Sequence, residues 1–329
     1  MAMKALQVVS PRCFAQVEAP MPALKPGEPD RILAQTRWVS LCGSDIPFFT
    51  GSKRHRTYPL APGAPIHECL GRVVESTSPN FKVGDAVIAI PEGDLGLAEY
   101  FTARSAKTVF LPPELAELDA ACLIQPLSTV INAVDRLGDI SGKMVAVIGL
   151  GSIGLFFCWL LKKAGAAVVT GIDPLPERCR AAEAIGADKT YPARSIEVVQ
   201  NARQDPAVWQ PPQICIEAVG HQMETINDCF ELVQKRGTIL AFGVPDQLVY
   251  AIEYEAFFRK NAALLAVVTP DWSEYLPRAR DLFLNHRDEL ERLVTHRLPI
   301  QEAGTAFTLY ANHSEGILKV ILDAATWNG

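Results

Sequence analysis

The chain has 329 residues, a length that predicts two domains. Its formal net charge of −6, from 37 acidic and 31 basic residues, gives no electrostatic reason to expect a nucleic acid or an anionic membrane as partner. The first residues form too short an apolar run for a signal peptide, and the eight cysteines show no C-x-x-C or disulfide spacing, so we expect a reducing, cytoplasmic location.

The first part of the chain predicts an all-β module. Short apolar runs are separated by turns rich in Pro and Gly, such as Lys25-Pro26-Gly27 and Val83-Gly84-Asp85. The expected strands cover 5–9, 32–39, 70–75 and 85–90.

From about Pro126 the pattern changes to alternating strands and helices, which is typical of a doubly wound parallel sheet. We expect strands at 145–148, 168–172, 214–217 and 238–242, with helices such as 177–185 and 223–234 between them. An amphipathic stretch at 275–293 and a final strand at 316–322 follow. The predicted fold class is therefore α/β, with a Rossmann-type sheet and a separate all-β domain.

The strand at 145–148 leads directly into G-x-G-x-x-G at Gly149, Gly151 and Gly154, which encloses Ser152 and Ile153. The first glycine permits a tight turn, the second lets a pyrophosphate approach the backbone, and the third lets the helix pack closely on the strand. The phosphates then meet the positive end of the helix. The alternative is a tight turn in an unrelated α/β protein.

A membrane span over 144–161 is disfavoured because the glycines interrupt the apolar stretch and Lys162 and Lys163 follow it.

An acid ends the second strand of this segment. Asp173 lies 19 residues after Gly154, where its carboxylate can accept hydrogen bonds from both hydroxyls of an adenosine ribose. A 2′-phosphate would be repelled there, so the sequence predicts NAD as the cofactor.

The β module also holds a candidate metal site. Cys42 and the pair His67-Glu68 bring a thiolate, an imidazole and a carboxylate into loops rich in Gly and Pro. Three such ligands leave one position open on a tetrahedral Zn²⁺, as a catalytic zinc needs. Spacing alone is no proof, since an ordinary exposed or core histidine is the usual alternative.

Several motifs together resemble the zinc-dependent medium-chain dehydrogenases/reductases, in particular the branch of sorbitol, threonine and glucose dehydrogenases. They span nearly the whole chain in the family's order. These motifs are Cys42-Gly43-Ser44-Asp45, Pro62-Gly63 with His67-Glu68, Phe81-Lys82-Val83-Gly84-Asp85, Ala98-Glu99-Tyr100, Gln125-Pro126-Leu127, the Gly149 fingerprint, Thr295-His296-Arg297-Leu298-Pro299 and Lys319-Val320-Ile321-Leu322.

The resemblance implies a GroES-like catalytic domain formed by residues 1–126 and 269–329, around a Rossmann NAD-binding domain at 127–268. By position, Cys42 and His67 would be zinc ligands, and Glu68 a third ligand or a close neighbour. Ser44 would begin a proton relay, and Asp45 would orient the histidine. Further site residues implied by the resemblance are Arg178 near the adenosine ribose, Val219, Phe242 and Gly243 along the nicotinamide, and Lys319 near the pyrophosphate.

The chain departs from the family's pattern at several positions. Residues 91–97 contain no cysteine where relatives often hold a structural zinc, so we expect a single catalytic zinc. Gln125 stands where this branch often has glutamate; its amide could ligate zinc or hydrogen-bond a water on it. Ile66 replaces a glycine common before the histidine. Pro47 stands where many relatives have the histidine that ends the proton relay.

The resulting prediction is a zinc-assisted, NAD-dependent dehydrogenase that reversibly oxidises a secondary alcohol, such as a polyol, sugar or cyclitol, to a ketone. The basic cluster 53–56 is either a solvated loop or an attractor for an anionic group on the substrate. The resemblance also implies a homo-oligomer, either a dimer or a tetramer, formed through edge strands of the Rossmann sheet. The alternatives are a zinc-free quinone or enoyl reductase of the same superfamily and a non-catalytic nucleotide-binding protein.

Overall fold

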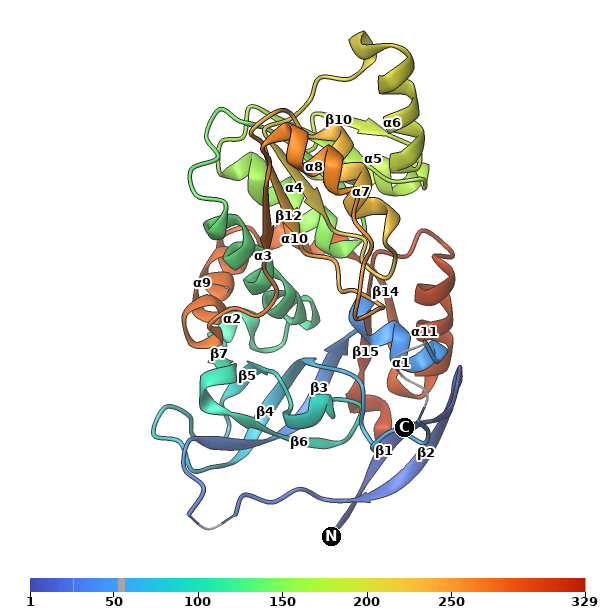
Figure 1. The fold of residues 1–329 in the computed structure, drawn as a ribbon. Helices are drawn as coiled ribbons and strands as arrows, with labels where there is room; N and C mark the ends of the chain where they lie inside the picture. Colours follow the sequence, from blue (N-terminus) through green and yellow to red (C-terminus); the bar gives the residue numbers. More distant parts are fainter. Residues whose placement is uncertain (26, 53–56, 329) are drawn as a thin grey trace. The chain divides into compact units, whose positions relative to one another are not determined.

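The computed structural model describes residues 1–25, 27–52 and 57–328. The chain forms two compact units, the first from residues 1–128 and 270–329 and the second from 129–269. The sequence analysis places the boundaries two residues and one residue earlier, after 126 and 268. The predicted class, a Rossmann-type sheet with a separate β domain, is confirmed (Figure 1).

The first unit is built on an antiparallel hairpin and a larger, mostly antiparallel sheet. A hairpin forms from β1 (Ala2–Ser10) and β2 (Cys13–Pro20). The larger sheet has the order β14-β15-β3-β4-β5-β7, with β6 paired to β3. Its strands are β3 (Arg31–Ser40), β4 (Glu68–Ser76), β5 (Ala86–Ala89), β6 (Tyr100–Arg104), β7 (Thr108–Phe110), β14 (Val294–Pro299) and β15 (Lys319–Asp323).

The end of the chain completes this sheet. Strand β15 pairs antiparallel with β3, with Ile321 opposite Ser40, and β14 runs parallel to β15. Two segments almost 300 residues apart therefore share one core, in which Phe49 and Phe307 pack with ring centroids 5.1 Å apart. The helices of this unit are α1 (Ile46–Thr50), α2 (Pro113–Ala116), α9 (Trp272–Asn285), α10 (Arg287–Leu290) and α11 (Ala303–Asn312), and α3 (Ile124–Arg136) crosses into the second unit.

The second unit is a six-stranded parallel sheet with the order β10-β9-β8-β11-β12-β13. The strand order reverses between β8 and β11, which makes their carboxyl ends the topological switch point where ligands of such sheets bind. The strands are β8 (Met144–Ile148), β9 (Val168–Ile172), β10 (Lys189–Tyr191), β11 (Ile214–Glu217), β12 (Thr238–Ala241) and β13 (Ala263–Ala266).

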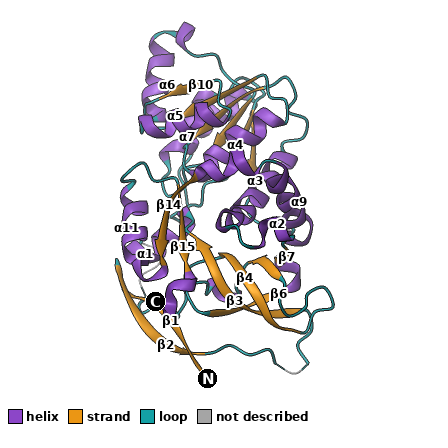
Figure 2. Ribbon diagram, turned by 180° about the vertical axis from the view of Figure 1, so that it is seen from behind, coloured by secondary structure: helices purple, strands orange, loops and turns teal. Residues whose placement is uncertain are grey.

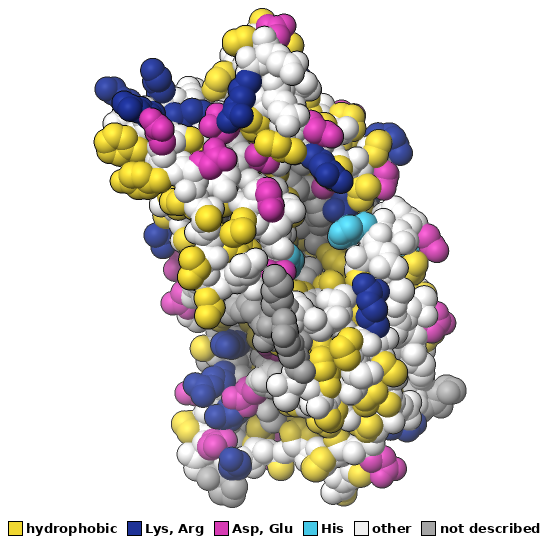
Figure 3. All heavy atoms as spheres, turned by 45° about the vertical axis from the view of Figure 1, so that its right-hand side comes forward, with side chains coloured by type: hydrophobic (Ala, Val, Ile, Leu, Met, Phe, Trp, Pro, Cys, Tyr) yellow, Lys and Arg dark blue, Asp and Glu magenta, His cyan; other side chains and the backbone are white. Residues whose placement is uncertain are grey.

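Helices connect the parallel strands of this sheet (Figure 2). Helices α4 (Ser152–Lys163) and α5 (Pro176–Ile185) contact each other, while α6 (Ser195–Gln204), α7 (Glu224–Leu232) and α8 (Tyr254–Lys260) form a second group (Figure 1). No helix among the described residues is long and apolar enough to cross a membrane. Basic and acidic side chains are interspersed on the face drawn in Figure 3, in keeping with the mixed charge of the sequence.

The structure differs from the sequence prediction in a few elements. Strands β2, β6, β7, β10, β13 and β14 lie outside the predicted strands. Strand β10 is short and polar, and β13 lies at a sheet edge with little of the alternation that marks a strand. The stretch 275–293 is divided after Asn285 into helix α9, helix α10 and a final 3₁₀ turn. The last strand begins at Lys319 rather than 316, because Gly316 adopts a φ of 65° in the preceding turn.

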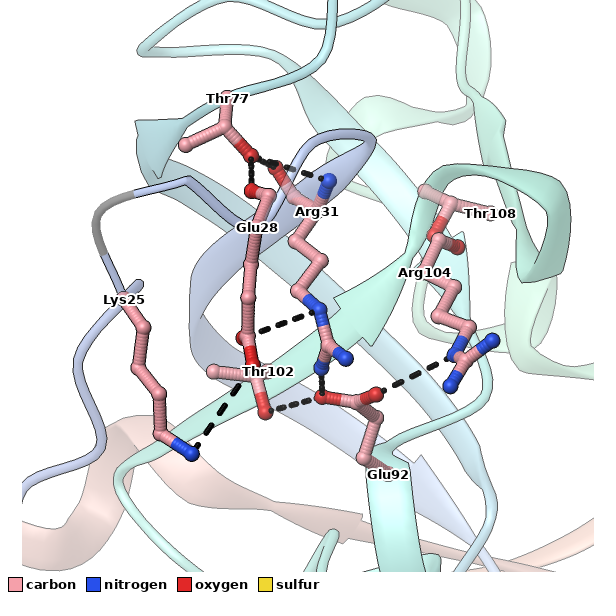
Figure 4. A network of polar contacts seen from close by, with 8 residues as sticks. All are labelled: Lys25, Glu28, Arg31, Thr77, Glu92, Thr102, Arg104 and Thr108. Carbon is pink, nitrogen blue, oxygen red and sulfur yellow. Dashed lines mark hydrogen bonds and ion pairs between the residues drawn. The ribbon is translucent and has the colours of Figure 1, made fainter.

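The loop 91–97, where we expect no structural zinc, is held by ion pairs. Glu92 accepts hydrogen bonds from Arg31, from the Arg104 Nε at 3.4 Å and from the Thr102 hydroxyl at 3.0 Å (Figure 4). Further along, the Gly96 backbone N–H donates to the Ile66 carbonyl at 3.0 Å. Side-chain and backbone bonds thus fix this loop beside the residue that precedes His67.

Candidate functional site

Strand register brings Cys42, His67 and Glu68 together. Ser40, the last residue of β3, pairs with Glu68, the first residue of β4. Cys42 follows that pair by two residues and His67 precedes it by one, so the two loops meet at the same end of the strands. One possible ligand atom from each of the three residues lies within 4.8 Å of the others, the one such cluster of His, Cys, Asp or Glu found among the described residues. The donor set fits a zinc ion.

Asp45, which the sequence predicts to orient the histidine, lies in contact with it. Its Oδ1 lies 3.1 Å from the His67 Nδ1, and its Oδ2 accepts a hydrogen bond of 2.8 Å from the Cys42 backbone N–H. This leaves the His67 Nε2 as the ring nitrogen available to a metal. Burial acts to lower the pKa of His67, but the carboxylate of Asp45 and the neighbouring Cys42 outweigh it, so the pKa is raised well above its ordinary value.

Glu68 is held from the other side by Lys319. Both side chains are completely buried, and the Lys319 Nζ lies 2.8 Å from Oε1 and 2.5 Å from Oε2 of Glu68. The Ser40 hydroxyl donates to the same carboxylate. Burial alone would lower the pKa of Lys319, but Glu68 and Cys42 raise it, so the ammonium stays charged. The structure thus places the Lys319 ammonium against Glu68, whose charge it neutralises; its expected position near the pyrophosphate stays a prediction.

The other predicted residues of this site lie on elements next to the cluster. Ser44 is half-buried in the 3₁₀ turn Gly43–Asp45, between Cys42 and Asp45. Gln125 is 4% exposed in the first turn of α3, and the 3₁₀ segment Asp119–Leu123 just before it packs on β3 and β4. The basic cluster 53–56 lies outside the described residues.

Two further thiols that sequence reasoning did not single out lie behind the cluster. Cys69 and Cys122 are fully buried, and the Cys122 Sγ contacts the Trp38 carbonyl at 3.5 Å. Burial first, and then nearby negative groups including Glu68, raise the pKa of both thiols. Both stay protonated at neutral pH and act as apolar packing.

In the second unit the glycine fingerprint has the geometry of a phosphate cradle. Gly149 has a φ of 92°, and a Cβ on Gly154 would lie 1.8 Å from the Gly149 carbonyl oxygen, so neither position accepts a side chain. Nothing lies within 4 Å of the place where a Cβ on Gly151 would point. Gly151 caps helix α4, whose first two residues are Ser152 and Ile153. The open space and the N–H groups at that helix end fit a dinucleotide pyrophosphate.

Asp173 lies at the carboxyl end of β9 and is 3% exposed. Its Oδ2 accepts a hydrogen bond of 2.8 Å from the Leu150 N–H, and its Oδ1 accepts one of 2.9 Å from the Leu175 N–H. Arg178 on α5 lies 3.6 Å from the same carboxylate. Asp173 is thus tied to the fingerprint turn, and Arg178 lies beside it.

The three residues expected along the nicotinamide occupy the loops after β11 and β12. A Cβ on Gly149 would lie 2.6 Å from a Val219 methyl group, so Val219 lies against the fingerprint. Phe242 packs edge-on against Phe157 of α4, with ring centroids 5.1 Å apart. The backbone N–H groups of Phe242 and Gly243 both donate to the Glu217 carbonyl at 3.0 Å.

Sequence reasoning missed Glu217 itself. Its buried side chain accepts hydrogen bonds from the loop after β11, and its backbone carbonyl accepts from the loop after β12. The sequence does carry one signal for Glu217, because it is an acid at the end of an apolar strand. Asp173 was identified from the same kind of position.

A glycine-rich phosphate cradle on a doubly wound sheet, together with a cysteine–histidine–glutamate cluster in a β domain, defines a dinucleotide-binding, metal-dependent oxidoreductase. Residues 28–113 match the model of the alcohol dehydrogenase GroES-like domain, and residues 152–285 match that of zinc-binding dehydrogenases. The chain belongs to the zinc-type medium-chain dehydrogenases, and it is an enzyme of that family.

Individual relatives agree with this assignment. Sorbitol dehydrogenase from Gallus gallus is 27% identical over 333 residues, covering 92% of this chain and 91% of its own. L-threonine 3-dehydrogenase from Caldanaerobacter subterraneus is 27% identical, covering 67% of this chain and 71% of its own. The solved structure of alcohol dehydrogenase TADH from Thermus sp. ATN1 has a TM-score of 0.84 and 24% identity, covering 98% of this chain and 100% of that one, and shows the shared fold.

Proposed function

We propose that this dehydrogenase uses NAD and one catalytic zinc to oxidise a secondary alcohol, such as a polyol, sugar or cyclitol, to a ketone. In the reaction the alcohol and NAD⁺ give the ketone, NADH and a proton, and the reverse reaction reduces the ketone. The observation that carries the proposal is the cluster of Cys42, His67 and Glu68 within 4.8 Å of one another.

Zinc would be held by Cys42 and His67, with Glu68 or Gln125 as the third protein group. When bound, zinc supplies a Lewis acid that lowers the pKa of an alcohol hydroxyl. Ligation by Glu68 would require its carboxylate to exchange the bonds to Lys319 and Ser40 for the metal. Gln125 supplies a neutral amide instead and adds no charge to the site.

The chain's own residues then hold the site and move the proton. Asp45 keeps the His67 ring in one orientation through the Nδ1 contact of 3.1 Å. The Ser44 hydroxyl, one residue before Asp45 in the same 3₁₀ turn, accepts the proton of the substrate hydroxyl and passes it outward. Lys319 balances the charge of Glu68, so the cluster carries less negative charge than its acids alone would give.

NAD rather than NADP is the proposed cofactor because a buried carboxylate, Asp173, lies where the adenosine ribose is expected. A 2′-phosphate would meet that negative charge. Arg178, 3.6 Å from Asp173, partly neutralises it, and we propose that it packs beside the ribose.

An activity assay with a panel of substrates, combined with a measurement of NAD binding, tests the proposal. Turnover of a panel of polyols, sugars and cyclitols, including phosphorylated members, is measured with NAD⁺ and with NADP⁺ for the wild type and for Cys42→Ser. We expect NAD-dependent turnover of a secondary alcohol that disappears in the variant, while NAD binding by calorimetry is retained. Full activity of Cys42→Ser, or a preference for NADP with quinones or enones as substrates, would favour the zinc-free reductase instead.

We also propose that the enzyme is a homo-oligomer assembled through the edge strand β13. Among the described residues this strand has no partner on its outer edge, and Leu264 on it is 45% exposed. On the neighbouring helix α8, Tyr254 and Phe258 are each 61% exposed and stack at 6.0 Å. Light scattering should give a dimer or a larger assembly for the wild type and a smaller species for Leu264→Lys; an unchanged mass would rule out this edge.

A further inference from the structure

Glu217 is the shared anchor of two loops at the carboxyl edge of the parallel sheet. It ends β11, one of the two strands at the switch point, and is 4% exposed. Its Oε1 accepts three hydrogen bonds, from the Val219 N–H at 3.0 Å, the Gly220 N–H at 2.9 Å and the Thr225 hydroxyl at 2.8 Å. All three partners are donors, so they match an ionised carboxylate.

The other carboxylate oxygen and the backbone of Glu217 reach the second loop. The Glu217 carbonyl accepts from the N–H groups of Phe242 and Gly243, each at 3.0 Å. A Cβ on Gly243 would lie only 2.4 Å from the Oε2 of Glu217. No side chain therefore separates this carboxylate from the Gly243 backbone. The hydrogen bonds to both loops and the close approach of Gly243 together hold Glu217 at the carboxyl edge of the sheet.

The direction of a bound dinucleotide along this edge follows from the strand order. Its pyrophosphate belongs at the Gly151 cradle after β8, and its adenosine half belongs beside Asp173 after β9. The other half must then extend over β11 and β12, where Glu217 lies. The nicotinamide ring at that end is positively charged in NAD⁺ and neutral in NADH.

We propose that Glu217 sets the preference of the enzyme between oxidised and reduced cofactor. Its fixed negative charge stabilises the cationic nicotinamide of NAD⁺ and contributes nothing comparable to NADH. The loops it holds place that charge without a separate ordering step. This inference rests on the proposed use of a nicotinamide dinucleotide.

The test measures the dissociation constants of NAD⁺ and NADH by calorimetry for the wild type and for Glu217→Gln. Glutamine keeps an oxygen acceptor for the three donors but removes the charge. We expect the ratio Kd(NAD⁺)/Kd(NADH) to rise by about tenfold, the size of a charge–charge effect near a partly solvated site. Thr225→Val is the matched control, because it removes one hydrogen bond to the same oxygen and keeps the charge; its ratio should stay within about twofold of the wild type.

A second measurement needs no variant, which matters if Glu217→Gln does not fold. Benzamide adenine dinucleotide has the shape of NAD⁺ without the ring charge, and the wild type should bind it about tenfold more weakly than NAD⁺. Equal affinity for the two, or an equal change of both constants in Glu217→Gln, would overturn the role of Glu217 while leaving dinucleotide binding intact. A wild type that binds none of these compounds would instead contradict the proposed function.

Discussion

At the scale of single residues, the buried pair of Lys319 and Glu68 is a strong determinant of both stability and site charge. Replacing Lys319 by Met leaves an uncompensated carboxylate in a completely buried place. We expect a loss of about 3–5 kcal/mol in the free energy of unfolding, measured by urea denaturation of zinc-free protein.

The double variant Lys319→Met with Glu68→Gln tests the reason for that loss. It removes both charges and should recover most of the lost free energy, because no unpaired ion remains buried. A Lys319→Met protein as stable as the wild type would show that the pair is dispensable.

The pairing of His67 with Asp45 predicts a pH dependence. Because the folded-state pKa of His67 is raised, its stabilisation is present below the ordinary pKa of histidine and disappears as the pH rises through the raised value. In zinc-free Asp45→Asn the pKa should fall, and the free energy of unfolding should drop by about 1–3 kcal/mol near pH 5.5 but by less at high pH. Titration of the ring by NMR, combined with denaturation at both pH values, checks this. An unshifted pKa would contradict it.

At the scale of elements, two glycines of the fingerprint serve different purposes. We expect Gly154 to be needed for the packing of helix α4 and Gly151 for dinucleotide binding. A Cβ on Gly151 points into open space, whereas one on Gly154 would collide with the Gly149 carbonyl. Gly151→Ala should therefore keep the melting temperature within about 2 °C and weaken NAD binding at least about tenfold, because the methyl group fills the phosphate cradle. Gly154→Ala should lower the melting temperature itself. Thermal unfolding and calorimetry distinguish the two; normal NAD binding by Gly151→Ala would be incompatible with the cradle.

Helices α6 and α7 are joined by a buried polar contact with its own pH signature. The Ser195 hydroxyl donates to the Asp228 carboxylate at 2.5 Å, and burial raises the pKa of Asp228. The folded state favours the protonated carboxyl group, and this stabilisation is lost as the pH rises through the raised pKa of Asp228. The charged carboxylate therefore lowers the free energy of unfolding at neutral pH. Asp228→Asn should unfold at a higher urea concentration than the wild type at pH 7, and the difference should shrink towards pH 3. A less stable variant at pH 7 would argue against this reading.

The pairing of β3 with β4 explains which part of the metal cluster could be predicted from the sequence and which part could not. The residue types and their loops predicted Cys42, His67 and Glu68 as a candidate metal site, and the family resemblance then implied Cys42 and His67 as zinc ligands. Cys42 and His67 are 25 positions apart, and the sequence could not predict that Ser40 pairs with Glu68 and so brings them together. The ion pair of Glu68 with Lys319 joins residues 251 positions apart, and no local pattern carries such a contact.

At the scale of the whole molecule, the local patterns predicted the parallel sheet but not that both ends of the chain share one domain. Only the family resemblance implied that arrangement, because the pairing of β15 with β3 leaves no local trace in either segment. Glu217 was missed for a different reason: its role depends on two loops that converge only after β11 and β12 pair. Residues that act through long-range packing are the ones sequence reasoning overlooks.

The most direct test of the whole account is the metal content of protein purified without chelator, measured by mass spectrometry for the wild type and for Cys42→Ser. The account predicts about one zinc per chain in the wild type and almost none in the variant, since three protein groups, one of them the Cys42 thiolate, form the single site expected. Two zinc ions per chain would contradict the absence of a structural zinc. A zinc-free wild type, with NAD still bound, would contradict zinc-assisted chemistry altogether.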